Sequence, residues 1–336
     1  MKKAELIKAL EAVRPGLANR ELIKQSTSFA FMKDRVVTYN DEISISYPIQ
    51  DLDLTGAIKA EELYAFLSKV KTEDIDVEIT DAEIRLKAGR AKAGFTLQAE
   101  ITLPLDGIGD ITKWKPVPDG LLDAIKFVSF GCSTDMSRPV LTCVHVTKSG
   151  NIEGGSNTRL TRYQTNPLPE HIPTFLLPAT SAKELVKYAA TEMAWGKGWI
   201  HFKTKEGCVF SCRVIEELFP DISGILKVEG TEFQFPKTID EILDRAAIFA
   251  IKNDPNDGDI TVSLEKNKIT LTSKNVAGWV EESANIRYKE ENVSFSINPI
   301  FLKEIVPKML QCVLGKASML FEGDGWEHVV ALKQVV

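Results

Sequence analysis

The residues of this chain best suited to binding a metal ion are two cysteines and a histidine near its middle. Cys208 and Cys212 lie four positions apart, and His201 precedes them. Thiolate and imidazole groups are the usual ligands of tetrahedral zinc. However, apolar residues alternate over 208–214, which predicts a strand, and residues four apart on a strand are separated by about 13 Å. That distance excludes a shared ion, so we expect no metal and no other cofactor.

Catalytic residues are equally hard to find. The sequence contains no glycine-rich phosphate loop and no nucleophile elbow. An acidic run at 254–259 resembles a calcium loop, but its glycine falls at the fifth position instead of the sixth, which favours a turn. We therefore expect a protein that is not an enzyme. The histidines are scattered singly along the chain, as His145, His171, His201 and His328.

The elements that carry these residues recur three times along the 336 residues. An amphipathic helical pattern opens each third, at separations of about 116 and 119 residues. A second helical pattern follows the first after about 56 to 62 residues, and alternating strands follow every helix. Each third of the sequence is therefore predicted to contain a helix, a group of strands, a second helix and a second group of strands, in that order. The first helices begin near Lys3, Asp119 and Thr238, and the second helices begin near Lys59, Ser181 and Pro299.

The predicted strands have one apolar face, which determines the fold class. Ile43, Ile45 and Tyr47 alternate with polar residues, and 260–264 does the same before a short polar link that predicts a hairpin. A sheet with one apolar face needs a cover, and two helices per third supply it. We expect an α+β protein of three tandem domains, each with two helices packed on antiparallel sheets. The proposed boundaries are 1–115, 116–230 and 231–336.

Charge is distributed unevenly along the chain. The net charge is -6, yet the six predicted helices together carry +4, which leaves -10 for the remainder. Mildly basic helices on an acidic protein suggest one face prepared for a polyanion. Lys8, Lys183 and Lys187 lie opposite the apolar stripes of their helices, although ordinary solvated lysines would show the same pattern. No apolar run approaches the length of a membrane span, so we expect a cytoplasmic protein without a membrane partner.

Four ordered motifs lie within residues 121–226. SRPVLTCVHV and GGSNTRLTRY come first, and LLPATSAKELVK and ELFPDISGIL follow. Their order and spacing resemble the middle domain of the bacterial DNA polymerase III beta subunit, the DNA sliding clamp. The resemblance extends more weakly to both ends, through FAFMKDRVVTYNDEISISY near the start and through RAAIFAIKN and HVVAL near the end. This divergence suggests a phage, plasmid or otherwise specialised version.

The resemblance implies a ring. Two chains would close head to tail into a homodimer of six clamp domains, with helices lining a hole that holds double-stranded DNA. Attraction between basic side chains and phosphates is independent of sequence, so such a ring could slide. The function implied is that of a polymerase processivity factor, with a replicative DNA polymerase and a clamp loader as partners.

A peptide-binding pocket is the second site that the resemblance implies. Asn157 and Thr158 stand where typical clamps have glycine and histidine, and Ala331 replaces a larger residue. These departures predict an altered peptide preference. An apolar pocket with an arginine at its rim suits a short peptide with aliphatic or aromatic anchors. The residues carried over are Leu141, Asn157, Thr158, Arg159, Leu160, Leu226, Val329 and Ala331.

The resemblance also assigns residues to the DNA and to the subunit interface. Arg20 and Arg138 match positions that face DNA in the family. Ile248 lies on the helix side opposite an apolar stripe, where solvent would favour a polar residue, so it predicts a contact with a partner. The full interface set implied is Ile248 and Phe249 of one subunit against Phe95 and Leu97 of the other.

Two other hypotheses belong to different classes. A DNA-binding processivity or regulatory protein that forms no ring would be monomeric and would bind linear and circular DNA alike. An enzyme acting on nucleic acid would need an activity that disappears when one carboxylate or cysteine is changed. The threefold repeat, the ordered motifs and the charge distribution favour the sliding clamp.

Overall fold

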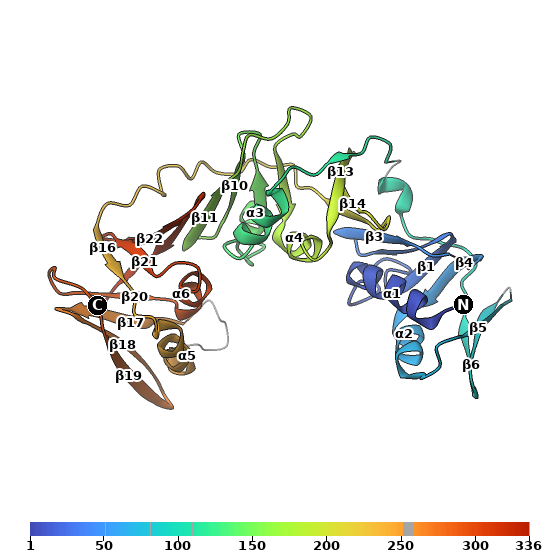
Figure 1. The fold of residues 1–336 in the computed structure, drawn as a ribbon, viewed down its shortest axis with the longest axis horizontal. Helices are drawn as coiled ribbons and strands as arrows, with labels where there is room; N and C mark the ends of the chain where they lie inside the picture. The colour runs from blue at the N-terminus through green and yellow to red at the C-terminus, as the bar shows by residue number, and fades with distance from the viewer. Residues whose placement is uncertain (51, 81, 109–110, 251–257, 336) are drawn as a thin grey trace. The chain divides into compact units, whose positions relative to one another are not determined.

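The computed structural model in Figure 1 describes residues 1–336 except 51, 81, 109–110, 251–257 and 336. The described chain forms two compact units. Unit 1 comprises Met1–Asp119 and Thr180–Glu216, and unit 2 comprises Gly120–Ala179 and Glu217–Val336. The domain boundaries inferred from the sequence repeat divide the chain differently and stay a prediction. Most of the calcium-like run at 254–259 lies outside the described residues.

Unit 1 contains helices, one large sheet and one small sheet, and all strand pairs are antiparallel. The helices are α1 (Lys3–Val13), α2 (Ala60–Lys69) and α4 (Ala179–Leu185). The small sheet has the order β5 (Asp76–Ile79), β6 (Glu83–Ala88), β7 (Ala91–Thr96). The eight-stranded sheet has the order β4 (Leu54–Lys59), β1 (Ser28–Lys33), β2 (Arg35–Tyr39), β3 (Ile43–Pro48), β15 (Val209–Arg213), β14 (Trp199–Thr204), β13 (Ala190–Gly196), β8 (Lys115–Pro116).

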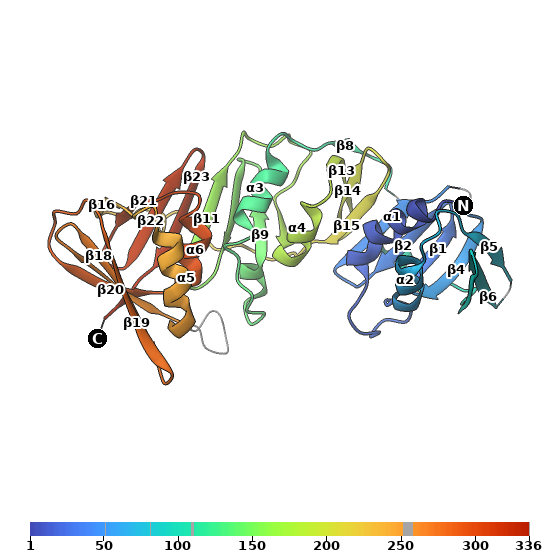
Figure 2. The same cartoon turned by 60° about the horizontal axis from the view of Figure 1, so that its bottom comes forward.

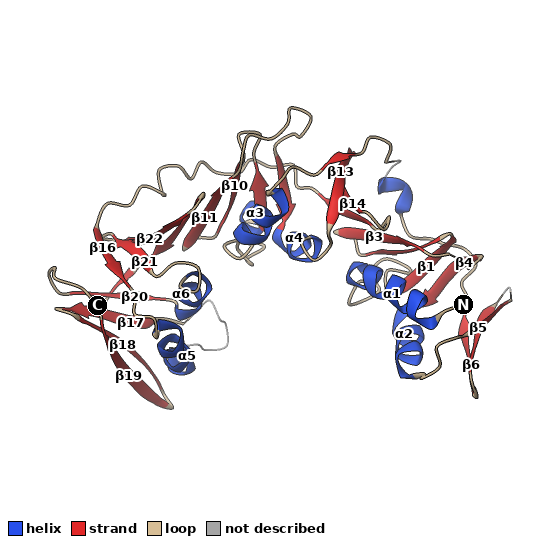
Figure 3. Ribbon diagram, viewed as in Figure 1, coloured by secondary structure: helices blue, strands red, loops and turns tan. Residues whose placement is uncertain are grey.

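Unit 2 repeats this plan with two antiparallel sheets, and its helices α5 and α6 lie side by side (Figures 2 and 3). The helices are α3 (Leu121–Val128), α5 (Ile239–Ala250) and α6 (Pro299–Ile305). The five-stranded sheet has the order β19 (Gly278–Asn285), β18 (Lys268–Asn275), β17 (Ile260–Glu265), β20 (Val293–Ile297), β24 (Lys333–Gln334). The eight-stranded sheet has the order β12 (Phe175–Pro178), β9 (Cys143–Val146), β10 (Asn151–Gly155), β11 (Arg159–Gln164), β23 (Trp326–Ala331), β22 (Ser318–Gly323), β21 (Gln311–Leu314), β16 (Thr231–Gln234).

One local pattern, a helix followed by a three-stranded meander, underlies both units. In the described residues it occurs six times, starting at each helix from α1 to α6. All six helices begin close to the positions that the sequence predicts, and the predicted hairpin at Glu265–Lys268 joins β17 to β18. The α+β fold class is therefore confirmed. None of the helices among the described residues is long and apolar enough to cross a membrane.

Local sequence explains how these helices start and which face they bury. At α6, Pro299 occupies the first turn and the Asn298 side chain accepts a hydrogen bond from the Ile300 backbone N–H, which caps the helix. At α5, apolar residues three and four apart form one stripe that packs on the sheet, and this stripe anchors the largest core of unit 2. Its members are Ile239, Ile242, Leu243, Ala246 and Ala250.

The third strand of each meander determines how the meanders join. We call the antiparallel pairing of β3 with β15 joint 1, and that of β11 with β23 joint 2. Joint 1 extends a sheet within unit 1, and joint 2 extends a sheet within unit 2. The two remaining third strands, β7 and β19, each form the edge of a sheet. In the described structure, β3, β15, β11 and β23 therefore each pair with the third strand of another meander. The third strands β7 and β19 each have one edge without a neighbouring strand.

Candidate functional site

A groove of about 530 Å³ lies over joint 2 in unit 2. Side chains alternate across a sheet, and those of Thr161 and His328 face Phe130 and Gly131 just after α3. Leu160 and its cross-strand partner therefore point to the opposite face. A row of residues crosses that face from strand to strand, namely Gly155, Leu160, Val329 and Leu320. The first three floor the groove, and Leu320 is buried against Leu160 and Val329.

The segment 219–226 forms one wall of this groove. Ile222 and Leu226 are buried against Leu160 and Val329, which pins the segment to the sheet. Ile225 is 58% exposed and lines the groove together with Pro220 and Asp221. Ile222 and Leu226 pack against the sheet and anchor the segment, and Ile225 presents an apolar surface to the groove.

The opposite rim is polar and comes from two loops. Arg138 donates a hydrogen bond from Nη1 to Asn157 Oδ1 at 2.9 Å, so the two loops are linked. Thr158 accepts the Ala331 backbone N–H at its carbonyl at 2.7 Å, which holds the rim to the end of β23. The groove thus combines an apolar floor with a fixed polar edge, an arrangement that suits a short peptide whose anchors bury while its backbone stays paired.

Arg159 separates this groove from a second hollow of about 480 Å³. Its guanidinium forms an ion pair with Glu304 and lies 4.4 Å from the ring centroid of Phe301, both on α6. Burial lowers the pKa of the neighbouring Lys308, whose ammonium lies 4.8 Å from the Phe130 ring. Arg159 is therefore fixed by charge and stacking together, and it contributes a positioned cation to both hollows.

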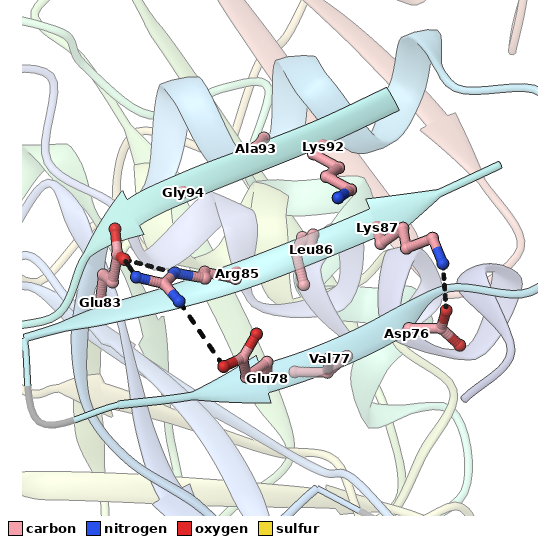
Figure 4. Close-up of a pocket in the computed structure, with 10 residues that line it drawn as sticks. All are labelled: Asp76, Val77, Glu78, Glu83, Arg85, Leu86, Lys87, Lys92, Ala93 and Gly94. Carbon is pink, nitrogen blue, oxygen red and sulfur yellow. Dashed lines mark hydrogen bonds and ion pairs between the residues drawn. The ribbon is translucent and has the colours of Figure 1, made fainter. Parts of the chain in front are cut away.

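The open strand edges carry the other candidate surfaces. Beside β7, a charged hollow of about 510 Å³ covers the small sheet of unit 1 (Figure 4). Lys87 pairs with Asp76 at 3.9 Å and Arg85 pairs with Glu78 at 3.6 Å. Lys92 of β7 lies directly opposite Lys87. These exposed pairs add little stability, but they leave β7 with a positive flank.

The edge at β19 in unit 2 has the opposite charge and an apolar border. Glu281 is exposed, and Glu282 pairs with Arg245 of α5 at 2.7 Å. Ile248 is 68% exposed on α5, as its place opposite the buried stripe predicted. Phe249 packs over Gly278, where an added Cβ would meet the Phe249 ring at 3.1 Å. Both edges therefore combine an unpaired backbone with side chains suited to a partner.

Comparison with known proteins identifies this fold. No protein-family model and no curated protein matches the chain. Among solved structures, the DNA polymerase III beta subunits of Pseudomonas aeruginosa and Streptococcus pyogenes match with TM-scores of 0.82 and 0.83 at 17% and 18% identity, covering 100% of this chain and 99% of each of theirs. The Bartonella birtlesii sliding clamp bound to griselimycin matches with a TM-score of 0.83 at 15% identity, covering 100% of this chain and 98% of its own.

The chain has the fold of a bacterial DNA sliding clamp. The resemblance found in the sequence is thus confirmed for the fold, and the low identity agrees with a divergent version. Within this clamp fold, seven of the eight predicted pocket residues line the groove over joint 2. The eighth, Leu226, is only 4% exposed and lies beneath the wall. Their role in binding a peptide stays a prediction.

Several groove residues were missed by the sequence analysis. Pro220 and Ile225 belong to the ELFPDISGIL motif that was recognised, yet the irregular backbone there gives no period from which to infer where a side chain points. Ala317 and Ser318 carry no signal, and Gly155 belongs to the GGSNTRLTRY motif but gives no sign there that it lines a groove, because these residues matter through their small size. A groove that exists because its lining side chains are small is hard to detect from residue types.

The predicted DNA-facing residues are all exposed. Lys8 on α1, Arg20, Lys183 on α4 and Lys187 belong to unit 1, and Lys187 pairs with Glu184 at 2.7 Å. Arg138 belongs to unit 2 and lies at the groove rim.

The loop that carries Arg20 is fixed by the buried side chain of Gln25. The Gln25 amide group donates to Gln98 at 2.9 Å and to the Glu100 carbonyl at 2.7 Å. These hydrogen bonds tie the end of the Arg20 loop to the segment 98–100.

The predicted interface residues divide between the two edges. Phe95 of β7 is half-buried against Phe66 of α2, with ring centroids 5.7 Å apart. Leu97 is 8% exposed and packs close to Gly56 within unit 1, so it supports the edge from below. Ile248 is available on the surface of unit 2. Their contact with a second subunit stays a prediction.

Proposed function

We propose that this chain is a DNA sliding clamp, a non-enzymatic ring that encircles duplex DNA in the cytoplasm and tethers replication proteins. The observation that carries the proposal is the pair of open third strands in a chain with the clamp fold over its whole length. Joint 1 and joint 2 both pair third strands of two meanders. The same pairing between β7 of one chain and β19 of another would use both remaining edges.

The pairing of β7 with β19 would join the two chains head to tail. A head-to-tail interface produces either a closed ring or an open filament, depending on whether its rotation divides a full turn. Two chains with three similar domains each would complete a ring of six. Lys92 on β7 and Glu281 on β19 provide opposite charges for such a joint, and Phe95, Ile248 and Phe249 provide apolar contacts.

Binding to DNA would then be weak and independent of sequence. Lys8, Lys183, Lys187, Arg20 and Arg138 are the candidates for contacts with phosphates, and the net charge of -6 over the whole chain limits non-specific adhesion. A ring keeps its hold through topology, so loose contacts permit sliding. No cofactor takes part in this function.

The groove over joint 2 would receive peptide segments of the replicative polymerase and of the clamp loader. Its small Ala331 and its polar Asn157 and Thr158 support an altered preference compared with typical clamps. Comparable affinity for a consensus clamp-binding peptide, measured by titration calorimetry on this chain and on a typical clamp, would contradict that preference.

The decisive experiment combines solution mass with retention on nicked circular DNA before and after linearisation. A sliding clamp should show the mass of two chains and should be lost from DNA once free ends exist. A monomer at every concentration that binds linear and circular DNA equally, with the same salt sensitivity, would overturn the proposal in favour of a DNA-binding protein that forms no ring.

A further inference from the structure

A row of three polar side chains lies beside the apolar floor of the groove. Glu153 of β10 is 6% exposed, with His145 of β9 opposite it on one side and Arg162 of β11 on the other. Its Oε1 accepts a hydrogen bond from Arg162 Nε at 2.9 Å and lies 2.8 Å from Arg162 Nη2 in an ion pair, and its Oε2 accepts a hydrogen bond from His145 Nδ1 at 3.0 Å. Both carboxylate oxygens are therefore paired.

The two partners of Glu153 also touch the groove wall. Arg162 donates to Ser223 Oγ at 3.2 Å, and the His145 ring stacks on Phe219 with centroids 4.7 Å apart and planes at 21°. Ser223 and Phe219 both belong to the wall segment, on either side of Pro220. The carboxylate thus connects to the wall at two points, although it does not line the groove itself.

The position of this row in the fold does not require charge. In unit 1, the residues paired in the same way beside joint 1 are Ala30, Val37 and Ser46 in place of His145, Glu153 and Arg162. Burying a carboxylate and a guanidinium costs several kcal/mol unless every partner is in place. Hydrogen bonds from His145 and Arg162 outweigh that burial and lower the pKa of Glu153, so the group stays ionised.

We propose that Glu153 is a positioning residue of the groove, which holds the 219–226 wall at a fixed distance from the floor through Arg162 and His145 and thereby sets the size of the peptide anchor. The inference rests on the proposed function of the groove. With the carboxylate removed, Arg162 and His145 would lose their common partner, and the wall would depend on apolar packing such as that of Ile222 and Leu226.

Titration calorimetry with two peptides tests this role. One is a consensus clamp-binding peptide with an aromatic anchor, and the other is the same peptide with leucine in place of that anchor. Glu153→Gln should weaken binding of the aromatic peptide about tenfold and should change the ratio of the two affinities, which a uniform loss of folded protein cannot do. Phe219→Ala should act similarly, and the double variant should lose no more than the stronger single variant, because both act through one wall.

Glu192→Gln is the matched control, since it also removes a carboxylate from an ion pair with Lys203 on a sheet of unit 1. It should leave both affinities unchanged, and retention on circular DNA should be normal for all variants. Additive losses, or a Glu153→Gln protein with wild-type affinities, would overturn the inference. If Glu153→Gln fails to fold, His145→Ala provides the same comparison. A wild-type protein that binds neither peptide would instead overturn the function proposed for the groove, and this inference with it.

Discussion

Joint 1 and joint 2 have the same backbone pairing, yet only joint 2 carries the groove described above. At joint 1 the equivalent positions are filled by large side chains of the protein itself. Arg213 lies 4.8 Å from the ring centroid of Trp199 and donates to Asp41 at 2.7 Å, and Tyr39 packs against the same tryptophan with centroids 6.2 Å apart. Leu103 covers this cluster. The registers align Tyr39, Trp199 and Arg213 with Gly155, Ser318 and Ala331 of joint 2.

Side-chain volume at three positions therefore decides which joint has an open groove. Gly155 is the tightest of them, because an added Cβ would lie 2.7 Å from Leu160 Cδ1. In joint 1 the space stabilises the protein through packing, whereas in joint 2 it is left open beside an apolar floor. The comparison teaches that one sheet geometry can carry either a packed core or an open groove, depending on small residues that the backbone tolerates equally.

The largest effect should come from emptying joint 1. Trp199→Ala should lower the free energy of unfolding by about 4 kcal/mol, because it removes a buried aromatic side chain and leaves Arg213 and Tyr39 without their partner. Urea denaturation monitored by circular dichroism measures this change. Ser318→Ala at the equivalent position of joint 2 is the control, with an expected change below about 0.5 kcal/mol. Equal losses in the two variants would show that the joints do not differ in this way.

Filling joint 2 should abolish its groove. The double substitution Ser318→Trp and Ala331→Arg transfers the joint 1 residues and should weaken peptide binding at least about 100-fold, since the added side chains occupy the space above Leu160 and Val329. Titration calorimetry measures the affinity, and retention on circular DNA should not change. Ala331→Ser serves as the control, because it adds a polar group at the same position but keeps the side chain small. Undiminished binding by the double variant would place the peptide site elsewhere.

A smaller effect should distinguish the joints by pH. Burial lowers the pKa of His201, beside joint 1, from its ordinary value of 6.5 to about 4, and that of His328, in joint 2, to about 3. Each histidine is neutral when folded, so its contribution to stability is complete above pH 6.5 and is lost as the pH falls toward the folded value. Between pH 7 and pH 5 each should cost about 2 kcal/mol of unfolding free energy.

Urea titrations at pH 7 and pH 5 test this prediction. His201→Asn and His328→Asn should each reduce the dependence on pH, although both lower stability at pH 7. His171→Asn, at an exposed position, should change neither the stability at pH 7 nor its dependence on pH. An unaltered dependence on pH in both buried variants would contradict the assignment of the effect to these two rings.

The sequence predicted the elements well because their signals are local. The stripe of α5 and the alternation in β17 repeat within a few residues, and each period fixes which face is buried. The exposure of Ile248 followed from the same period. The irregular segment 219–226 has no such period, so the directions of Leu226 and Ile225 could not be inferred, and the buried row around Glu153 went unnoticed because its members are distant in sequence.

The sequence by itself determined the α+β class, the six helices and the tandem order of helix and strands, since these depend on periodicity among neighbours. Only the tertiary structure decided that third strands pair at two joints and leave β7 and β19 open. It alone revealed that the small residues Gly155, Ser318 and Ala331 leave a groove at joint 2. At joint 1 the equivalent space is filled by Tyr39, Trp199 and Arg213. The size of a groove and the burial of its side chains depend on contacts between strands that are far apart in the chain, and no local sequence pattern encodes those contacts.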